Sequence, residues 1–202
     1  MASIVSWNVR GLNWPNKQED LKLFLHKNKV GLIDFLETKV KIPKVDIIAN
    51  VLFPRWNWHH NFHNNPKGRI WLAWNPVVYH VDILFTTDQM IHGRVRQLHT
   101  NNSFIISVVY GMNTITQRQQ LWEDIFDLIP QNEAWCVLGD FNAVRSMEER
   151  IGGDPVTEYE IQELNSMMEN CELQEAPTVG AFYTWTNKKI WSRLDRVLIN
   201  DL

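Results

Sequence analysis

The chain has 202 residues, of which 45% are hydrophobic and 21% are charged, so it can bury a sizeable core and is too apolar for intrinsic disorder. Its formal net charge of −3 argues against tight, processive binding to nucleic acid through phosphates, but it leaves room for a site that meets one phosphate through a metal ion. No apolar stretch approaches the roughly 20 residues of a membrane span, and the two cysteines form no CxxC pair, which indicates a reducing compartment.

The N-terminal part of the chain alternates between predicted strands and helices. Short apolar runs predict the strands, and apolar residues at helical spacing predict the helices. Asn16 is expected to cap the first helix, because an Asn side chain can accept from a free N–H group in the first turn. The predicted ranges are residues 3–7 (strand), 16–28 (helix), 31–36 (strand) and 43–53 (helix).

The middle of the chain is predicted to form an antiparallel meander. Short runs rich in β-branched and aromatic residues alternate there with turn-formers, such as those at residues 64–68. The predicted strands cover residues 56–62, 69–74, 77–85, 91–99 and 104–110.

The C-terminal part returns to alternating helices and strands. A helix over residues 114–128 is expected to bury one face formed by Leu121, Trp122, Ile125 and Phe126, and a second helix is expected over residues 158–171. The predicted strands there are residues 135–139, 182–186 and 193–200. Together these elements predict one α/β domain over residues 1–202, with two sheets and outer helices.

Polar side chains follow the predicted strands at the points where the strands end. Because strand ends in α/β sheets commonly lie along one rim where ligands bind, we expect these side chains to converge on one site. The residues are Asn8, Glu37, Tyr110, Asn113, Asp140, Asn142 and Asp195.

These residue types suit metal-assisted hydrolysis of a phosphoester. Carboxylate and amide oxygens favour Mg²⁺ or Mn²⁺ over zinc, and a free carboxylate can deprotonate a water molecule. Each residue alone has a commoner interpretation. Asn8 could be a turn residue, Glu37 a solvated charge, and Asp195 a partner in a surface ion pair with Arg193 or Arg196.

The order and context of these residues resemble the endonuclease/exonuclease/phosphatase (DNase I-like) superfamily. The chain also looks like the endonuclease domain of plant LINE-type (non-LTR) retrotransposons over essentially its whole length. The superfamily motifs lie at residues 6–11, 36–39, 109–113, 139–142 and 192–198. The segments similar to the plant elements are residues 8–13, 68–75 and 182–186.

The resemblance implies a four-layer α/β/β/α sandwich and assigns roles to the polar residues. Glu37 would be the main metal ligand, and Asn8 would help to bind the metal and the phosphate. Asp140 would position or activate the attacking water, and Asn142 would orient Asp140 and the phosphate.

Three further residues receive roles from the same resemblance. Tyr110 and Asn113 would contact the scissile phosphate. Asp195 would hold a catalytic histidine in its useful tautomer.

The activity implied by the resemblance is Mg²⁺- or Mn²⁺-dependent nicking of DNA. The domain would belong to an element that also encodes a reverse transcriptase. We expect weak binding to DNA, no membrane partner, a monomer and an intracellular location, which would be nuclear if the domain functions.

The sequence departs from the family at its end. In the family a Ser-Asp-His motif and a core strand follow the Asp195 motif, whereas this sequence ends at Leu202 and its last histidine is His99. We therefore expect a C-terminally incomplete domain that lacks its C-terminal strand segment and has weak activity or none. An inactive remnant and a phosphatase acting on a small phosphoester are the two alternative functions.

Three other features of the sequence have more than one interpretation. The histidines within residues 59–63 lack the further ligands that a zinc site needs, which favours exposed or interfacial histidines. Lys39, Lys41 and Lys44 either line a path for phosphates or form a solvated face. Trp185 either contacts DNA or packs against the protein.

Overall fold

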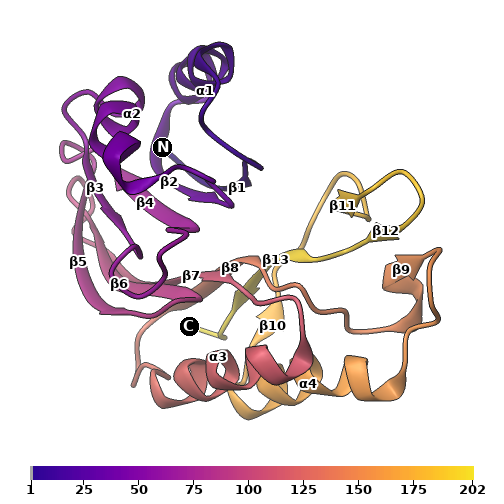
Figure 1. Ribbon diagram of the computed structural model, residues 1–202. Helices are drawn as coiled ribbons and strands as arrows, with labels where there is room; N and C mark the ends of the chain where they lie inside the picture. The colour runs from indigo at the N-terminus through magenta and orange to yellow at the C-terminus, as the bar shows by residue number, and fades with distance from the viewer. Residues whose placement is uncertain (1) are drawn as a thin grey trace.

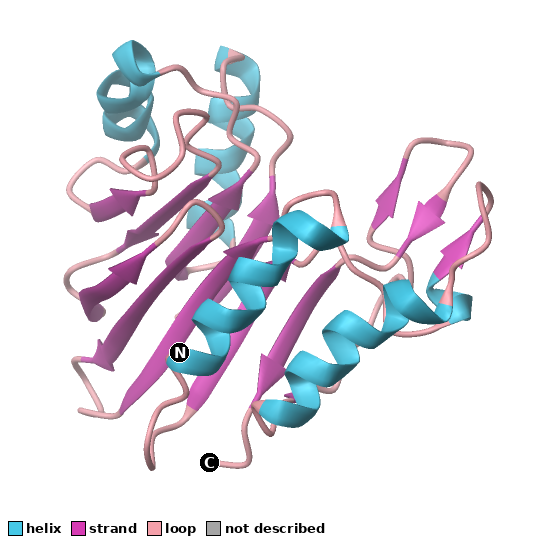
Figure 2. Ribbon diagram, turned by 60° about the horizontal axis from the view of Figure 1, so that its bottom comes forward, coloured by secondary structure: helices cyan, strands magenta, loops and turns pink. Residues whose placement is uncertain are grey.

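Two β-sheets pack face to face in the computed structural model, which describes residues 2–202 (Figure 1). Helices α1 and α2 cover the outer face of the first sheet, and α3 and α4 cover the outer face of the second (Figure 2). The four-layer α/β/β/α sandwich expected from the sequence is confirmed. No helix in this part of the chain is long and apolar enough to cross a bilayer.

The first sheet has the strand order β1-β2-β4-β3. β1 runs parallel to β2, and the other pairs are antiparallel. β2 and β4 are buried along their whole length, which explains why both read as continuous apolar runs. The strands are β1 (Ser3–Asn8), β2 (Val30–Leu36), β3 (Asn57–His60) and β4 (Ile70–Trp74).

The second sheet has the strand order β10-β13-β8-β7-β6-β5, and only β7 and β8 run parallel. Its strands are β5 (Tyr79–Thr86), β6 (Met90–Gln97), β7 (Ser103–Tyr110), β8 (Trp135–Asp140), β10 (Gln174–Glu175) and β13 (Asp195–Ile199). A small third sheet extends beyond the end of the sandwich in Figure 1. It contains β9 (Arg150–Ile151), β11 (Trp185–Thr186) and β12 (Trp191–Ser192).

The predicted meander is divided between the two sheets. β3 and β4 pair in the first sheet, whereas β5, β6 and β7 pair in the second. The chain crosses between the sheets in a turn at Asn75, whose side chain accepts from Val77 N and whose carbonyl accepts from Val78 N. Runs of β-branched and aromatic residues identify strands but do not show which strands pair. The prediction of a single meander was therefore wrong.

The first helix begins at a proline and not after the predicted cap. α1 (Pro15–Lys27) starts at Pro15, so Trp14 is its N-cap and the predicted cap Asn16 lies inside the helix. Proline at the first position presets the helical φ angle and lacks an N–H group that would be left free. The remaining helices are η1 (Ile42–Lys44), α2 (Val45–Leu52), α3 (Ile115–Asp127), η2 (Met147–Glu149) and α4 (Glu158–Asn170).

The buried face of α3 is narrower than predicted. Leu121 and Ile125 are fully buried, but Trp122 is only half-buried and Phe126 is 54% exposed. Residues four positions apart share one face of a helix, and Phe126 lies about 100° away from Ile125 around the axis. Phe126 was therefore wrongly assigned to the core.

An apolar layer fills the space between the two sheets. It contains Leu32 and Leu36 from β2 and Ile106 and Val108 from β7. Separate apolar clusters lie under α1 and α2 and under α3 and α4. The inter-sheet layer fixes how the ends of the first-sheet strands meet those of the second.

Candidate active site

Asn8 and Asp140 join the two sheets at the end of the sandwich. Asn8 ends β1, Asp140 ends β8, and Asn8 Nδ2 donates to Asp140 Oδ2 over 2.8 Å. Asn8 Oδ1 is buried and has no hydrogen-bond partner among residues 2–202. A buried polar atom without a partner is uncommon, so this oxygen is available to a ligand.

The backbone after β8 holds the other oxygen of Asp140. Asn142 N donates to Asp140 Oδ1 over 3.0 Å, and Asn142 Nδ2 donates to Gly111 O over 2.7 Å. Asn142 has a φ of 49°, in the left-handed region that Asn tolerates better than most residues. Gly139 has a φ of +134°, and a Cβ there would lie 2.1 Å from Val109 O. Only glycine allows β8 to approach β7 so closely just before Asp140.

Asp195 lies directly across from Asp140 in the β8–β13 register. Burial raises the pKa of both carboxyls, and the nearby Asp195 charge raises the pKa of Asp140 further. Thr184 Oγ1 accepts from the backbone N–H of Asp195 over 3.0 Å, which fixes the start of β13. In the described residues no histidine hydrogen-bonds to Asp195, so its expected partner is not seen.

Glu37 lies at the same rim, just after β2. Its φ of 56° turns the chain sharply, and its backbone N–H donates to Arg69 O over 2.8 Å. The carboxylate lies 3.2 Å from Lys39 Nζ. Burial is the main cause of the raised pKa of Asp140 and of Tyr110, and the charge of Glu37 raises both further, as expected for groups that share one rim.

Tyr110 ends β7 and is the register partner of Asp140 in β8. The guanidinium of Arg69 lies 4.9 Å from the centre of its ring. Burial and the charge of Glu37 raise the pKa of Tyr110 to about 12, so its hydroxyl stays protonated at neutral pH. Tyr110 can therefore donate a hydrogen bond.

The structure thus brings most of the predicted residues together. Asp140 contacts or pairs with four of them, and Glu37 lies at the same rim. Asn113 is the exception, because it is exposed in the loop before α3 and its side chain makes no hydrogen bond within residues 2–202. The catalytic and binding roles of all these residues stay predictions. The four partners of Asp140 are Asn8, Tyr110, Asn142 and Asp195.

Other residues at the site were not identified from the sequence. The buried Gln89 accepts from Met112 N over 2.7 Å and from Tyr110 N through its backbone carbonyl, so it holds the strand end and the loop that follows. Gln89 lies in the turn between β5 and β6, where no local pattern predicts a contact with β7. Thr184 and Arg69 were noted within motifs but were given no role.

Within residues 2–202, the side chains of the histidine segment and of Trp185 make no hydrogen bond to the polar residues described above. His59 and His60 stack with ring centres 6.1 Å apart, and burial lowers the pKa of each. Residues 2–202 contain no group of three or more His, Cys, Asp or Glu side chains that could hold a metal ion. Trp185 is half-buried, with Arg10 positioned 5.8 Å from its ring centre.

The donors at the rim nevertheless fit one hard divalent cation. Asn8 Oδ1 has no partner within residues 2–202, and burial together with the charge of Asp195 raises the pKa of Asp140, an effect that a nearby cation would offset. Mg²⁺ is usually held by one or two carboxylates together with water and substrate phosphates, so three clustered acids are not required. Glu37 and Asn8 are the side chains that would hold it.

Comparisons with known proteins identify the family of the chain and agree with its fold. The model of the Endonuclease/Exonuclease/phosphatase family matches residues 5–201. The fold is similar to the endonuclease domain of TRAS1, a telomere-specific non-LTR retrotransposon, with a TM-score of 0.73 and 14% identity, covering 98% of this chain and 84% of that chain. No curated protein sequence matches the chain.

Two further solved structures have the same fold. The 3′ phosphatase NExo from Neisseria, bound to a product DNA hairpin, gives a TM-score of 0.70 at 18% identity and covers 98% of this chain and 86% of its own. The AP endonuclease LMAP from Leishmania major gives a TM-score of 0.72 at 13% identity. The match covers 98% of this chain and 78% of that chain. At these identities the likeness shows the fold alone.

Proposed function

The chain belongs to the endonuclease/exonuclease/phosphatase family, and on that premise we propose that it hydrolyses phosphodiester bonds in DNA as a nicking endonuclease. The observation that carries the proposal is the contact between Asn8 and Asp140, with Asp195 and Glu37 beside it. In this contact the amide nitrogen of Asn8 donates to a carboxyl of raised pKa, while the amide oxygen of Asn8 has no partner within residues 2–202.

We further propose that the domain originates from a plant LINE-type retrotransposon. The support is the set of segments at residues 8–13, 68–75 and 182–186, which look like those elements. The fold shared with the endonuclease domain of TRAS1 is compatible with this origin. On this proposal the native partners are DNA and the reverse transcriptase of the parent element.

Asp140 is suited to accept a proton from the attacking water. Each of its oxygens already accepts one hydrogen bond, from Asn8 and from the backbone of Asn142, so its orientation is fixed while other lone pairs stay free. A carboxylate whose pKa is raised toward neutrality is a better general base than a solvated one. Asn8 and Asn142 therefore act as positioning residues for Asp140.

Tyr110 and Glu37 act on the phosphate side of the same rim. The hydroxyl of Tyr110 stays protonated because its pKa is about 12, so it can donate to a phosphate oxygen as negative charge develops. A Mg²⁺ or Mn²⁺ ion held by Glu37 and Asn8 would polarise a phosphoryl oxygen. Asp195 would keep its charge close to Asp140 and raise its basicity.

A nicking assay on supercoiled plasmid with Mg²⁺ or Mn²⁺ tests the proposal. Glu37→Gln and Asp140→Asn keep the size of each side chain and remove its charge, and each should slow nicking by about 100-fold or more. Glu19→Gln is the matched control, since Glu19 is exposed on α1 and, within residues 2–202, forms an ion pair only with Lys22. It should nick at the wild-type rate.

The outcomes separate the candidate functions. Equal nicking by the wild type and both site variants would point to a contaminating nuclease. No nicking by the wild type with either metal ion would favour an inactive remnant. Release of phosphate from a small phosphoester without nicking would favour the phosphatase, which the likeness to the fold of a 3′ phosphatase keeps as the second candidate.

A further inference from the structure

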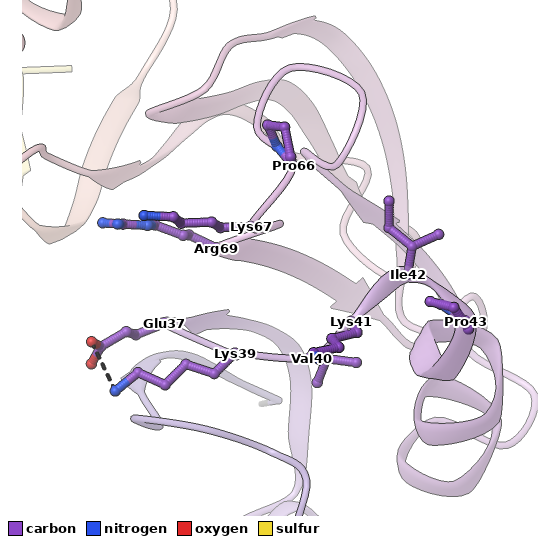
Figure 3. A pocket seen from close by; sticks show the side chains of 9 residues that line it. All are labelled: Glu37, Lys39, Val40, Lys41, Ile42, Pro43, Pro66, Lys67 and Arg69. Carbon is purple, nitrogen blue, oxygen red and sulfur yellow. Dashed lines mark ion pairs between the residues drawn. The ribbon is translucent and has the colours of Figure 1, made fainter.

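A pocket of about 580 Å³ adjoins the candidate active site and shares Glu37 with it. Its two walls are residues 37–43 and residues 66–69. Figure 3 shows Lys67 and Arg69 extending in parallel from one wall, and Glu37 and Lys39 on the facing wall. Lys41 also lines the pocket.

The pocket carries unbalanced positive charge. Lys39 is paired with Glu37, but neither Lys41 nor Lys67 lies within 4.0 Å of a carboxylate in the described residues. The guanidinium of Arg69 is placed over the ring of Tyr110 and likewise has no carboxylate partner there. Since both lysines are exposed, the positive charge can reach a ligand from solvent.

Buried asparagines hold the wall that carries Lys67 and Arg69. The fully buried Asn61 donates to Asp88 O over 3.0 Å and accepts from Ile70 N over 3.1 Å. Asn65 also donates to Asp88 O, and its Oδ1 accepts from Lys67 N over 3.0 Å. These bonds fix the backbone of the loop, so its basic side chains project from a rigid base.

Direct hydrogen bonds fasten the two walls together. Glu37 N donates to Arg69 O over 2.8 Å, and the buried Thr38 Oγ1 donates to Gly68 O over 3.0 Å. Gly68 has a φ of +48°, and a Cβ there would lie 2.2 Å from the ring of Phe62. The pocket is therefore preorganised, which reduces the entropy lost when a ligand binds.

Charge is also divided unevenly along the chain. Residues 1–112 contain 13 Lys and Arg against 7 Asp and Glu, whereas residues 113–202 contain 7 against 16. α4 has no Lys or Arg, and it covers the second sheet on the side away from the pocket (Figure 1). The net charge of −3 thus conceals a basic N-terminal part of the chain, which supplies the residues that line the pocket and would attract a polyanion.

We propose that this pocket binds a phosphate of the substrate strand other than the scissile one, through Lys41, Lys67 and Arg69. The inference rests on the proposed function for the identity of the strand. A small phosphoester with a single phosphate has no second phosphate to place there, so the pocket would make the site prefer a phosphodiester strand to such a substrate. DNA and RNA share this backbone chemistry, and the test separates them.

Binding of labelled oligonucleotides in EDTA, followed by fluorescence anisotropy over a series of salt concentrations, measures the pocket without hydrolysis. Lys41→Gln and Lys67→Gln should each weaken binding by about 3- to 10-fold, and each should reduce the slope of log K against log salt by about one. Lys27→Gln is the control, because Lys27 loses the same charge at the exposed end of α1 outside the pocket. Duplex DNA, single-stranded DNA and RNA of equal length form the three arms.

The control should bind within about twofold of the wild type with an unchanged slope. Three results would overturn the proposal that the pocket binds a phosphate. These are equal weakening of binding by all three substitutions, no weakening by either pocket variant, and no binding by the wild type. Stronger binding in a DNA arm than in the RNA arm would identify the strand as DNA.

The same variants distinguish failure of the pocket from failure of the proposed function. If binding depends on the pocket but the wild type does not nick DNA, the proposed nuclease function is rejected and the proposed phosphate binding stands. Nicking by the wild type together with unchanged binding by Lys41→Gln and Lys67→Gln would reject the pocket and keep the nuclease.

Discussion

Acidification should destabilise the protein through His92, a buried histidine in β6. Its side chain is 4% exposed, and its Nδ1 lies 2.8 Å from Ser107 Oγ. Ser107 Oγ also accepts from Trp135 Nε1 over 2.9 Å. An indole N–H can only donate, so the Ser107 hydroxyl is satisfied when its proton points at an unprotonated His92 Nδ1. The folded protein therefore holds His92 in its neutral form.

The size of the effect follows from the pKa. Burial and the charge of Arg94 lower the pKa of His92 from 6.5 to about 4. Between these values the unfolded chain binds a proton that the folded chain does not, so the free energy of unfolding falls as the pH falls. The contribution of neutral His92 to the free energy of unfolding is fully present above pH 6.5. It is reduced by about 2 kcal/mol at pH 5 and by about 3 kcal/mol once the pH is below 4.

Urea unfolding followed by tryptophan fluorescence measures this dependence. The wild type is compared with His92→Asn, which keeps a hydrogen-bond acceptor near Ser107 but cannot take a proton in this range. Other titrating groups affect both proteins alike, so the difference between the two curves isolates His92. Between pH 7.5 and pH 5 the free energy of unfolding of the wild type should fall by about 2 kcal/mol more than that of His92→Asn. Parallel curves over this range would refute the reasoning.

Three further substitutions test the site and its support. Tyr110→Phe removes the hydroxyl donor and should slow plasmid nicking by about 10-fold while leaving the urea midpoint nearly unchanged; a wild-type rate would exclude this donor. Gly139→Ala should lower the free energy of unfolding by at least about 2 kcal/mol, because the new Cβ meets Val109 O; an unchanged urea midpoint would contradict the close β7–β8 approach. Glu149→Gln should lower it by about 3 kcal/mol, because the fully buried Arg196 loses one of its two carboxylate partners; a thermal midpoint equal to the wild type would show that Glu175 alone suffices.

Residues at strand ends could be located from the sequence because the apolar run and the polar residue are adjacent. Asn8, Glu37 and Asp140 each follow a run that the local pattern identifies as a strand. That such ends meet at one rim is a general property of α/β sheets, so the approximate site could be predicted without coordinates. Their catalytic roles came from the family resemblance and need the assays above.

Contacts between distant segments could not be predicted in the same way. Gln89 holds the loop after β7 although it lies in an ordinary turn, and Asn61 and Asn65 fix a loop through the carbonyl of Asp88. Pairing of strands also depends on tertiary packing, which is why the predicted meander proved to be divided. The start of α1 is a different case, because Pro15 is itself a local signal for the first helical position, and the prediction of Asn16 as the cap overlooked it.

The hydrogen bond between Asn8 and Asp140 gives the inter-sheet layer an importance beyond stability. Each sheet supplies one half of the contact, so its length reports how the two sheets are stacked. A substitution deep in the sandwich, such as Ile106→Val, could shift one sheet by a few tenths of an ångström without unfolding the chain. Such a shift would move Asn8 and Glu37, at the strand ends of the first sheet, relative to Asp140 in the second, so some inactive variants of this protein should carry changes far from any group that touches DNA.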